Sequence, residues 1–123
     1  MEACLDTNFL IYCVKQKIDF VELLRDNGFN SIIIPESVLH ELEKLVSELR
    51  GKEKVFAKIA LEMAKRFEVV DTKSSGDEAL IEVCLKRDCH LFTNDRRLIR
   101  KARDLGIKTG YVRGLKKIYF DWF

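Results

Sequence analysis

Short apolar stretches alternate with helical stretches along the whole chain, and this alternation limits the possible folds more than any other feature. The clearest apolar stretch is 31–34, where three isoleucines stand just before Pro35, as is typical of a strand buried on both faces. Strands that alternate with helices predict a mainly parallel sheet with helices on both sides. We therefore expect a three-layer α/β/α fold with a sheet of about five strands. The expected strands lie at 3–5, 31–34, 67–70, 91–93 and 107–112, the expected helices at 9–14, 20–25, 36–49, 52–66, 77–87 and 95–105, and 115–123 is unassigned.

The length of 123 residues fits one domain, which we expect to span 1–123. A chain of this length buries roughly two-thirds of its unfolded surface, so its folding requires neither a metal ion nor a disulfide. Charged residues make up 34% of the chain, and no apolar run approaches the ~20 residues of a membrane span. Glu2 and Asp6 stand where a signal peptide would be basic and apolar. We expect a cytoplasmic protein without a membrane partner.

The four cysteines, Cys4, Cys13, Cys84 and Cys89, lie in apolar segments and show no C-x-x-C spacing. Isolated thiols in such segments are typical of a hydrophobic core, whereas zinc sites usually contain closely spaced pairs. We therefore expect reduced core cysteines, with neither a disulfide nor a zinc site.

Two of the expected strands end at or near an acid. Asp6 follows the strand at 3–5, and Asp95 follows the strand at 91–93 after one intervening residue. In parallel α/β sheets the carboxyl ends of the strands face the crevice where ligands bind, so both acids are candidates for a functional site. The alternative role for either one is to cap the helix that comes next.

Helical spacing adds two more acids. Glu41 lies three residues after Val38, beside the apolar stripe of its helix. Asp77 stands at the start of the next acidic helix, in line with Leu80 and its apolar stripe, and the adjacent Glu78 is an alternative to it. The competing interpretations are a solvated surface acid for Glu41 and a helix-dipole acid for Asp77.

Carboxylates gathered in one crevice repel each other. At ~4 Å and an effective dielectric constant of about 20, each pair costs about 4 kcal/mol, so a cation is a natural neutralising partner. Oxygen ligands suit hard ions such as Mg²⁺ or Mn²⁺, and the two histidines, His40 and His90, are isolated in the sequence. Ions of this kind activate water and stabilise charge on a phosphoryl oxygen, which makes phosphodiester hydrolysis the leading hypothesis.

Four motifs, in order and at suitable spacing, resemble those of PIN-domain ribonucleases over nearly the whole chain. They are Leu5-Asp6-Thr7-Asn8, the segment 35–43 with Val38, Glu41 and Leu42, the segment 76–80, and Thr93-Asn94-Asp95-Arg96-Arg97-Leu98. The resemblance implies a PIN-like fold and an RNA endonuclease that uses one or two Mg²⁺ or Mn²⁺ ions and leaves a 5′-phosphate and a 3′-hydroxyl. It implies that the metal-binding catalytic residues are Asp6, Glu41, Asp77 and Asp95, with Asn8, Glu78, Thr93 and Asn94 as auxiliary residues.

Basic residues follow the fourth motif. A negatively charged nuclease crevice needs positive charge at its margin to hold a phosphate backbone. Arg96, Arg97, Lys116 and Lys117 are the predicted RNA-binding residues. Two further arginines of the same helix, Arg100 and Arg103, fit a solvated helix face at least as well.

The resemblance covers two branches of the family. The motifs look more like the ribosomal RNA-processing branch, which implies a pre-ribosome partner, whereas the short chain equally suits a toxin paired with an antitoxin. More distant alternatives are a haloacid-dehalogenase-like phosphatase, for which Asn8 stands in place of the required second acid, and a non-catalytic RNA-binding module. PIN proteins often pair, and five aromatic residues are candidates for a homodimer surface: Phe9, Tyr12, Phe120, Trp122 and Phe123.

Overall fold

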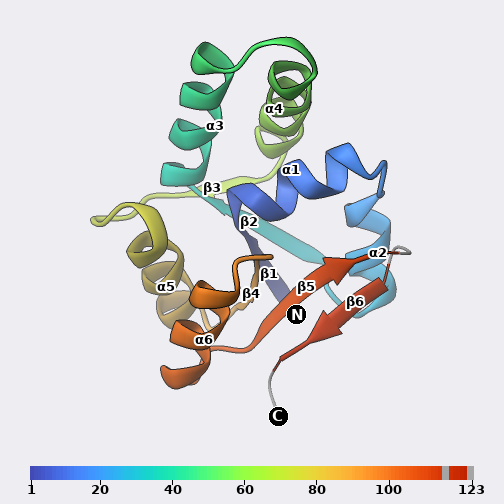
Figure 1. The fold of residues 1–123 in the computed structure, drawn as a ribbon. Helices are drawn as coiled ribbons and strands as arrows, with labels where there is room; N and C mark the ends of the chain where they lie inside the picture. Colours follow the sequence, from blue (N-terminus) through green and yellow to red (C-terminus); the bar gives the residue numbers. More distant parts are fainter. Residues whose placement is uncertain (115–116, 122–123) are drawn as a thin grey trace.

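One sheet of six strands forms the centre of the computed structural model, which describes residues 1–114 and 117–121 (Figure 1). The strands follow the order β3-β2-β1-β4-β5-β6, and the first five run parallel. Strand β6 pairs antiparallel with β5 at the edge. The strands are β1 (Glu2–Leu5), β2 (Ser31–Pro35), β3 (Glu68–Val70), β4 (His90–Phe92), β5 (Thr109–Arg113) and β6 (Lys117–Phe120).

Helices cover both faces of this sheet. Helices α1 and α2 connect β1 to β2 on one side, and α5 and α6 lie on the other (Figure 1). Helices α3 and α4 pack against each other at the top of the view. The predicted three-layer α/β/α fold is therefore confirmed. The helices are α1 (Thr7–Lys15), α2 (Phe20–Asp26), α3 (Glu36–Glu48), α4 (Gly51–Ala64), α5 (Gly76–Arg87) and α6 (Arg96–Asp104).

Strand β6 is the main difference from the sequence-based expectation. It lies in the unassigned segment 115–123, so the described sheet has one strand more than the five expected. In β6 only Ile118 is fully buried, and the Tyr119 ring stacks on Tyr111 of β5 at a centroid distance of 5.5 Å. Such a short edge strand depends on pairing with its neighbour more than on its own hydrophobic pattern. Pro35 ends β2 and is the N-cap residue of α3.

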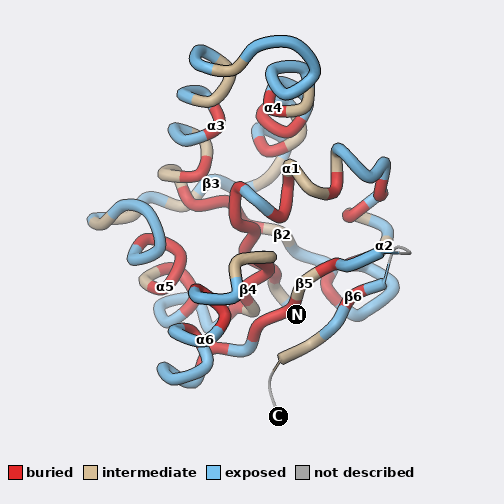
Figure 2. Tube along the Cα trace, viewed as in Figure 1, coloured by how far each residue is buried: buried red, intermediate tan, exposed pale blue. Residues whose placement is uncertain are grey.

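The core follows the central strands (Figure 2). The Phe92 ring of β4 lies 5.7 Å from the Phe9 ring and 4.9 Å from the Phe29 ring. A Cβ atom on Gly110 would come within 2.7 Å of Phe92, so the neighbouring strand has a glycine beside this ring. The interpretation of Phe9 as a surface aromatic is wrong, because Phe9 is fully buried by this packing.

Other parts of the aromatic surface prediction have different outcomes. Phe120 is half-buried, with its ring 6.3 Å from that of Phe29, so it also contributes to the core. Trp122 and Phe123 lie outside the described residues. Within the described part of the chain, none of the helices combines the length and apolar character required to cross a membrane.

Candidate active site

The two strand-end acids lie at the centre of the sheet. Strands β1 and β4 are neighbours, with Leu5 paired to Phe92. From β1 the chain continues to β2 on one side, whereas from β4 it continues to β5 on the other. The carboxyl ends of β1 and β4 therefore form the switch point of the sheet, where α/β folds usually bind their ligands.

Asp6 is the most constrained acid of this region. Its side chain is only 8% exposed. Oδ1 accepts a hydrogen bond from the backbone N–H of Thr7 at 2.7 Å, and Oδ2 accepts from Thr93 Oγ1 at 2.7 Å and from Asn8 Nδ2 at 2.9 Å. Asp6 also caps α1, so the capping role considered from the sequence coexists with a place in the crevice.

The residues predicted as auxiliary join the two strand ends. Asn8 Oδ1 accepts hydrogen bonds from the Asn94 backbone N–H at 2.8 Å and from Thr93 Oγ1 at 3.2 Å. Asn94 Oδ1 in turn accepts from the Val112 N–H of β5 at 3.2 Å. This network fixes the loop after β4 against the start of α1, which holds Asp6 in one orientation.

Burial raises the pKa of Asp6 to about 6. The hydrogen bonds from Thr93 and Thr7 oppose this shift, and the negative charges of Glu41 and Asp77 add to it. Helices α3 and α5 therefore bring their acids close enough to Asp6 to act on its ionisation. The charges of three of the four predicted acids, Asp6, Glu41 and Asp77, therefore interact.

The two adjacent acids on α5 have different electrostatic partners. Glu78 forms an ion pair with Lys101 of α6, so its charge is compensated there. Asp77 instead acts on the carboxyl group of Asp6. Both side chains are exposed. The choice of Asp77 made from helical spacing stays a prediction.

Asp95 occupies a different position from the other acids. Its Oδ1 accepts hydrogen bonds from the backbone N–H groups of Arg97 at 2.9 Å and Leu98 at 3.4 Å, which caps α6. Its own N–H donates to Thr93 Oγ1 at 3.1 Å, and the same hydroxyl bonds to Asp6. Thr93 therefore links the two strand-end acids, with Asp95 at the rim of the crevice.

The donor atoms of this region are oxygens, which suit a hard divalent ion. Within 1–114 and 117–121, no three acids of the crevice bring carboxylate oxygens within 4.8 Å of one another. Mg²⁺ usually keeps several water ligands, so an open arrangement of acids still fits it. The Thr7 hydroxyl, next to Asp6 in the chain, is buried without a hydrogen-bond partner in the described structure. Sequence reasoning did not single out this further oxygen.

A basic pocket of about 590 Å³ has Asn94 and Arg96 in its wall, the two neighbours of Asp95 in the chain. Arg96, Arg100 and Arg103 enter it from α6 at spacings of four and three residues, which places them on one helix face. Arg113 of β5 also lines it. The remaining polar and aromatic wall includes Tyr12, Tyr111 and Asp121, and Asp121 pairs with Arg103 at 3.2 Å.

Of the predicted RNA-binding residues that the structure describes, only one lines this pocket. Arg96 lines it, whereas Arg97 is exposed and does not. Lys117 is exposed on β6 with its Nζ 5.4 Å from the Tyr119 ring centroid, and Lys116 lies outside the described residues. Arg100 and Arg103, which also fit a solvated helix face, line the same pocket as Arg96, as their spacing along the helix allows.

Comparisons with known proteins agree with this geometry. Residues 3–115 match the model of a family described as PIN like domain. The chain belongs to the PIN family. This PIN protein is 48% identical to ribonuclease VapC9 of Archaeoglobus fulgidus over 97% of its own length and 88% of that protein. It is also 34% identical to the rRNA-processing protein fcf1 of Schizosaccharomyces pombe, matching with 82% of its own length and spanning about half of that protein (53%).

A solved structure gives the same result. The PIN domain endonuclease Utp24 superposes with a TM-score of 0.79 and 30% identity, over 99% of this chain and 92% of that one. Family membership is confirmed, and at the level of the family so is the prediction of a ribonuclease, with relatives in both suggested branches. Their names leave the individual site residues, the metal ion and the RNA target as proposals.

Proposed function

We propose that this PIN protein is an RNA endonuclease that requires Mg²⁺ or Mn²⁺, held by Asp6, Glu41, Asp77 and Asp95. The observation that carries the proposal is the buried carboxyl group of Asp6, with the charges of two further acids acting on it. Burial of an acid beside other acids is unfavourable for folding alone and favours a site that binds a cation.

The protein's own residues supply position and charge for the reaction. Asp6 is ionised above pH 6, and the hydrogen bonds from Thr7, Asn8 and Thr93 orient its oxygens. Arg96 at the rim binds the phosphate backbone and keeps the scissile bond beside the acids. A divalent cation, when bound, lowers the pKa of a water molecule and offsets charge on the phosphoryl oxygens.

The proposal is tested by cleavage of end-labelled single-stranded RNA in Mn²⁺, Mg²⁺ or EDTA. We expect wild type to cut only with a divalent ion. Asp6→Asn and Glu41→Gln should lower the rate at least about 100-fold, at or beyond the upper limit for a residue that only orients a metal ligand. Glu43→Gln is the matched control, because Glu43 is an exposed acid of the same helix and should not matter.

Cutting that persists in EDTA, or equal activity in all variants, would contradict the proposal. Circular dichroism and thermal unfolding of each variant show whether it remains folded. If cleavage of RNA is absent while small phosphate esters are hydrolysed, the phosphatase alternative replaces the nuclease.

The extent of similarity favours the VapC type over rRNA processing as the biological role. The VapC9 match covers most of both chains, whereas the fcf1 match covers about half of that protein. We therefore propose that the physiological partner is an antitoxin that holds the nuclease inactive, and that a pre-ribosome is the alternative partner. Growth arrest on expression, relieved by the product of an adjacent gene, would support the antitoxin. Normal growth together with sedimentation on ribosomal precursors would favour the alternative.

A further inference from the structure

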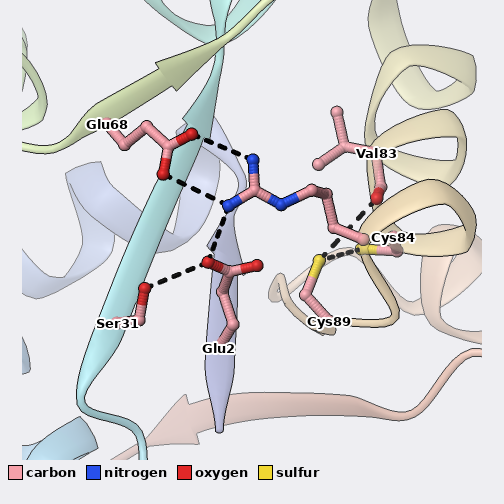
Figure 3. A network of polar contacts seen from close by, with 7 residues as sticks. Glu2, Ser31, Glu68, Val83, Cys84 and Cys89 are labelled. Atoms are coloured by element: carbon pink, nitrogen blue, oxygen red, sulfur yellow. Dashed lines mark hydrogen bonds and ion pairs between the residues drawn. The ribbon is translucent and has the colours of Figure 1, made fainter.

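Three buried cysteines from distant parts of the sequence meet inside the protein. Cys4 lies on β1, Cys84 on α5 and Cys89 in the connection to β4, and their exposed fractions are 0%, 2% and 5%. Their sulfur atoms all lie within 4.8 Å of one another. Figure 3 shows Cys84 and Cys89 side by side, with 3.5 Å between their Sγ atoms.

We propose that Cys4, Cys84 and Cys89 form a binding site for a soft cation, copper(I). Metal–thiolate bonds are about 2.3 Å long, so an ion at the centre of three sulfurs needs them about 4 Å apart. The observed sulfur separations are compatible with that triangle. The ordinary alternative is a packed group of reduced thiols that binds nothing.

The number and type of ligands favour copper(I) over zinc. Structural zinc sites have four protein ligands in tetrahedral geometry. The metal-binding group formed by the described residues at this point contains the three cysteines, and no histidine or acid is close enough to join it. Thiolates select soft ions, whereas the acids of the crevice select hard ones. The two sites therefore differ in the class of metal that they bind.

A surface pocket lies next to two of the cysteines. A pocket of about 320 Å³ has Cys84 and Cys89 in its wall, together with Glu2, His90 and Lys108. The positive charge of Lys108 reduces the net negative charge that a copper(I)–thiolate group brings into this region. Cys13 on α1 is buried elsewhere, and burial raises the pKa of its thiol to about 12.

Anaerobic titration of the reduced full-length protein with copper(I), in competition with a chromogenic copper(I) chelator, tests the site. We expect wild type to withdraw one equivalent from the chelator, with tighter binding at higher pH because the thiols must lose protons. Cys84→Ser and Cys89→Ser should each weaken binding at least about 100-fold. Cys13→Ser should bind copper(I) as wild type does, because it removes a buried thiol outside the site.

Several outcomes would overturn the proposal. These are failure of wild type to compete with the chelator, equal affinity in Cys84→Ser and Cys13→Ser, and zinc binding as tight as copper(I) binding when zinc is titrated against a chromogenic zinc chelator. A Cys84–Cys89 disulfide that forms readily on exposure to air would identify a redox pair instead of a metal site. Thermal unfolding monitors folding of each variant, and bound copper(I) should raise the midpoint in wild type and Cys13→Ser but not in Cys84→Ser.

Discussion

Acids lie at both ends of the parallel strands, but their electrostatic surroundings are opposite. At the amino ends of the strands, Glu2 and Glu68 share one guanidinium group: Arg87 bonds to Glu2 at 2.9 Å and to both oxygens of Glu68 at 2.9 and 3.2 Å (Figure 3). At the carboxyl ends, burial raises the pKa of Asp6, and the charges of Glu41 and Asp77 add to the shift.

The difference shows how a structural acid can be told from a functional one in this protein. Hydrogen bonds from Arg87 lower the pKa of Glu68, so folding itself stabilises that charge. Burial and the neighbouring acids make the charge of Asp6 unfavourable, so a ligand is needed to stabilise it. The charge of Glu68 is compensated within the chain, whereas the uncompensated charge of Asp6 makes it the candidate for binding a cation.

The sharpest test lies on α5, where Glu78 pairs with Lys101 and the adjacent Asp77 acts on Asp6. Asp77→Asn should lower metal-dependent RNA cleavage at least about 100-fold, because it removes a proposed cation ligand. Glu78→Gln should leave the rate within a few-fold of wild type, because Glu78 is neutralised by Lys101. Single-turnover cleavage assays measure both rates. The reverse order of effects would exchange the roles of the two acids.

The raised pKa of Asp6 predicts how metal-free stability depends on pH. The unfolded carboxyl group titrates near 3.8 and the folded one at about 6, so between these values the folded protein holds a proton that the unfolded chain has lost. This group therefore lowers stability as pH rises from about 4 to about 6, by about 3 kcal/mol in total, with no further loss above.

Urea unfolding in EDTA across this pH range measures the effect. Asp6→Asn should remove this part of the slope, while the contributions of all other groups remain in both proteins. Added Mg²⁺ should stabilise wild type at neutral pH and have little effect on the variant. Parallel pH profiles for the two proteins would show that the carboxyl group of Asp6 is not perturbed.

For the basic pocket we expect a smaller effect, which is on RNA affinity. In an Asp6→Asn background, Arg100→Ala and Arg113→Ala should each weaken RNA binding and reduce the slope of log affinity against log salt by roughly 0.7, because one phosphate contact is lost. Arg25→Ala on α2 is the control, since this exposed arginine does not line the pocket. Fluorescence anisotropy at several salt concentrations distinguishes these outcomes. Equal slopes in all variants would show that the pocket does not bind the RNA backbone.

We expect the smallest effect from a substitution at the amino ends of the strands. Arg87→Met breaks the bonds to Glu2 and Glu68, and we expect a slightly lower urea midpoint whose difference from wild type shrinks at high salt, because exposed ion pairs are screened. RNA cleavage should be unchanged. A loss of cleavage in a folded Arg87→Met protein would show that the amino ends of the strands are coupled to the crevice at their carboxyl ends.

Local patterns identified most of the elements and the acids, because each depends on a few neighbouring residues. Three β-branched residues before Pro35 indicate a buried strand. The position of Asp6 directly after a strand places it at the carboxyl ends of the parallel strands. Strand β6 was not identified, because its stability comes from pairing with β5. The basic pocket was only partly identified, since Arg113 joins the α6 arginines through the sheet and not through the sequence.

The sequence by itself determined the alternation of strands and helices and the order of the four acids, since hydrophobic periodicity and strand-end positions are local properties. Tertiary structure decided what those residues meet. The charge of Asp77 acts on Asp6, whereas Glu78 pairs with Lys101, although the two acids are adjacent in the chain. Tertiary structure also brought Cys4 together with Cys84 and Cys89 from the far half of the sequence. Contacts between distant segments depend on how strands and helices pack, and spacing along the chain does not contain that information.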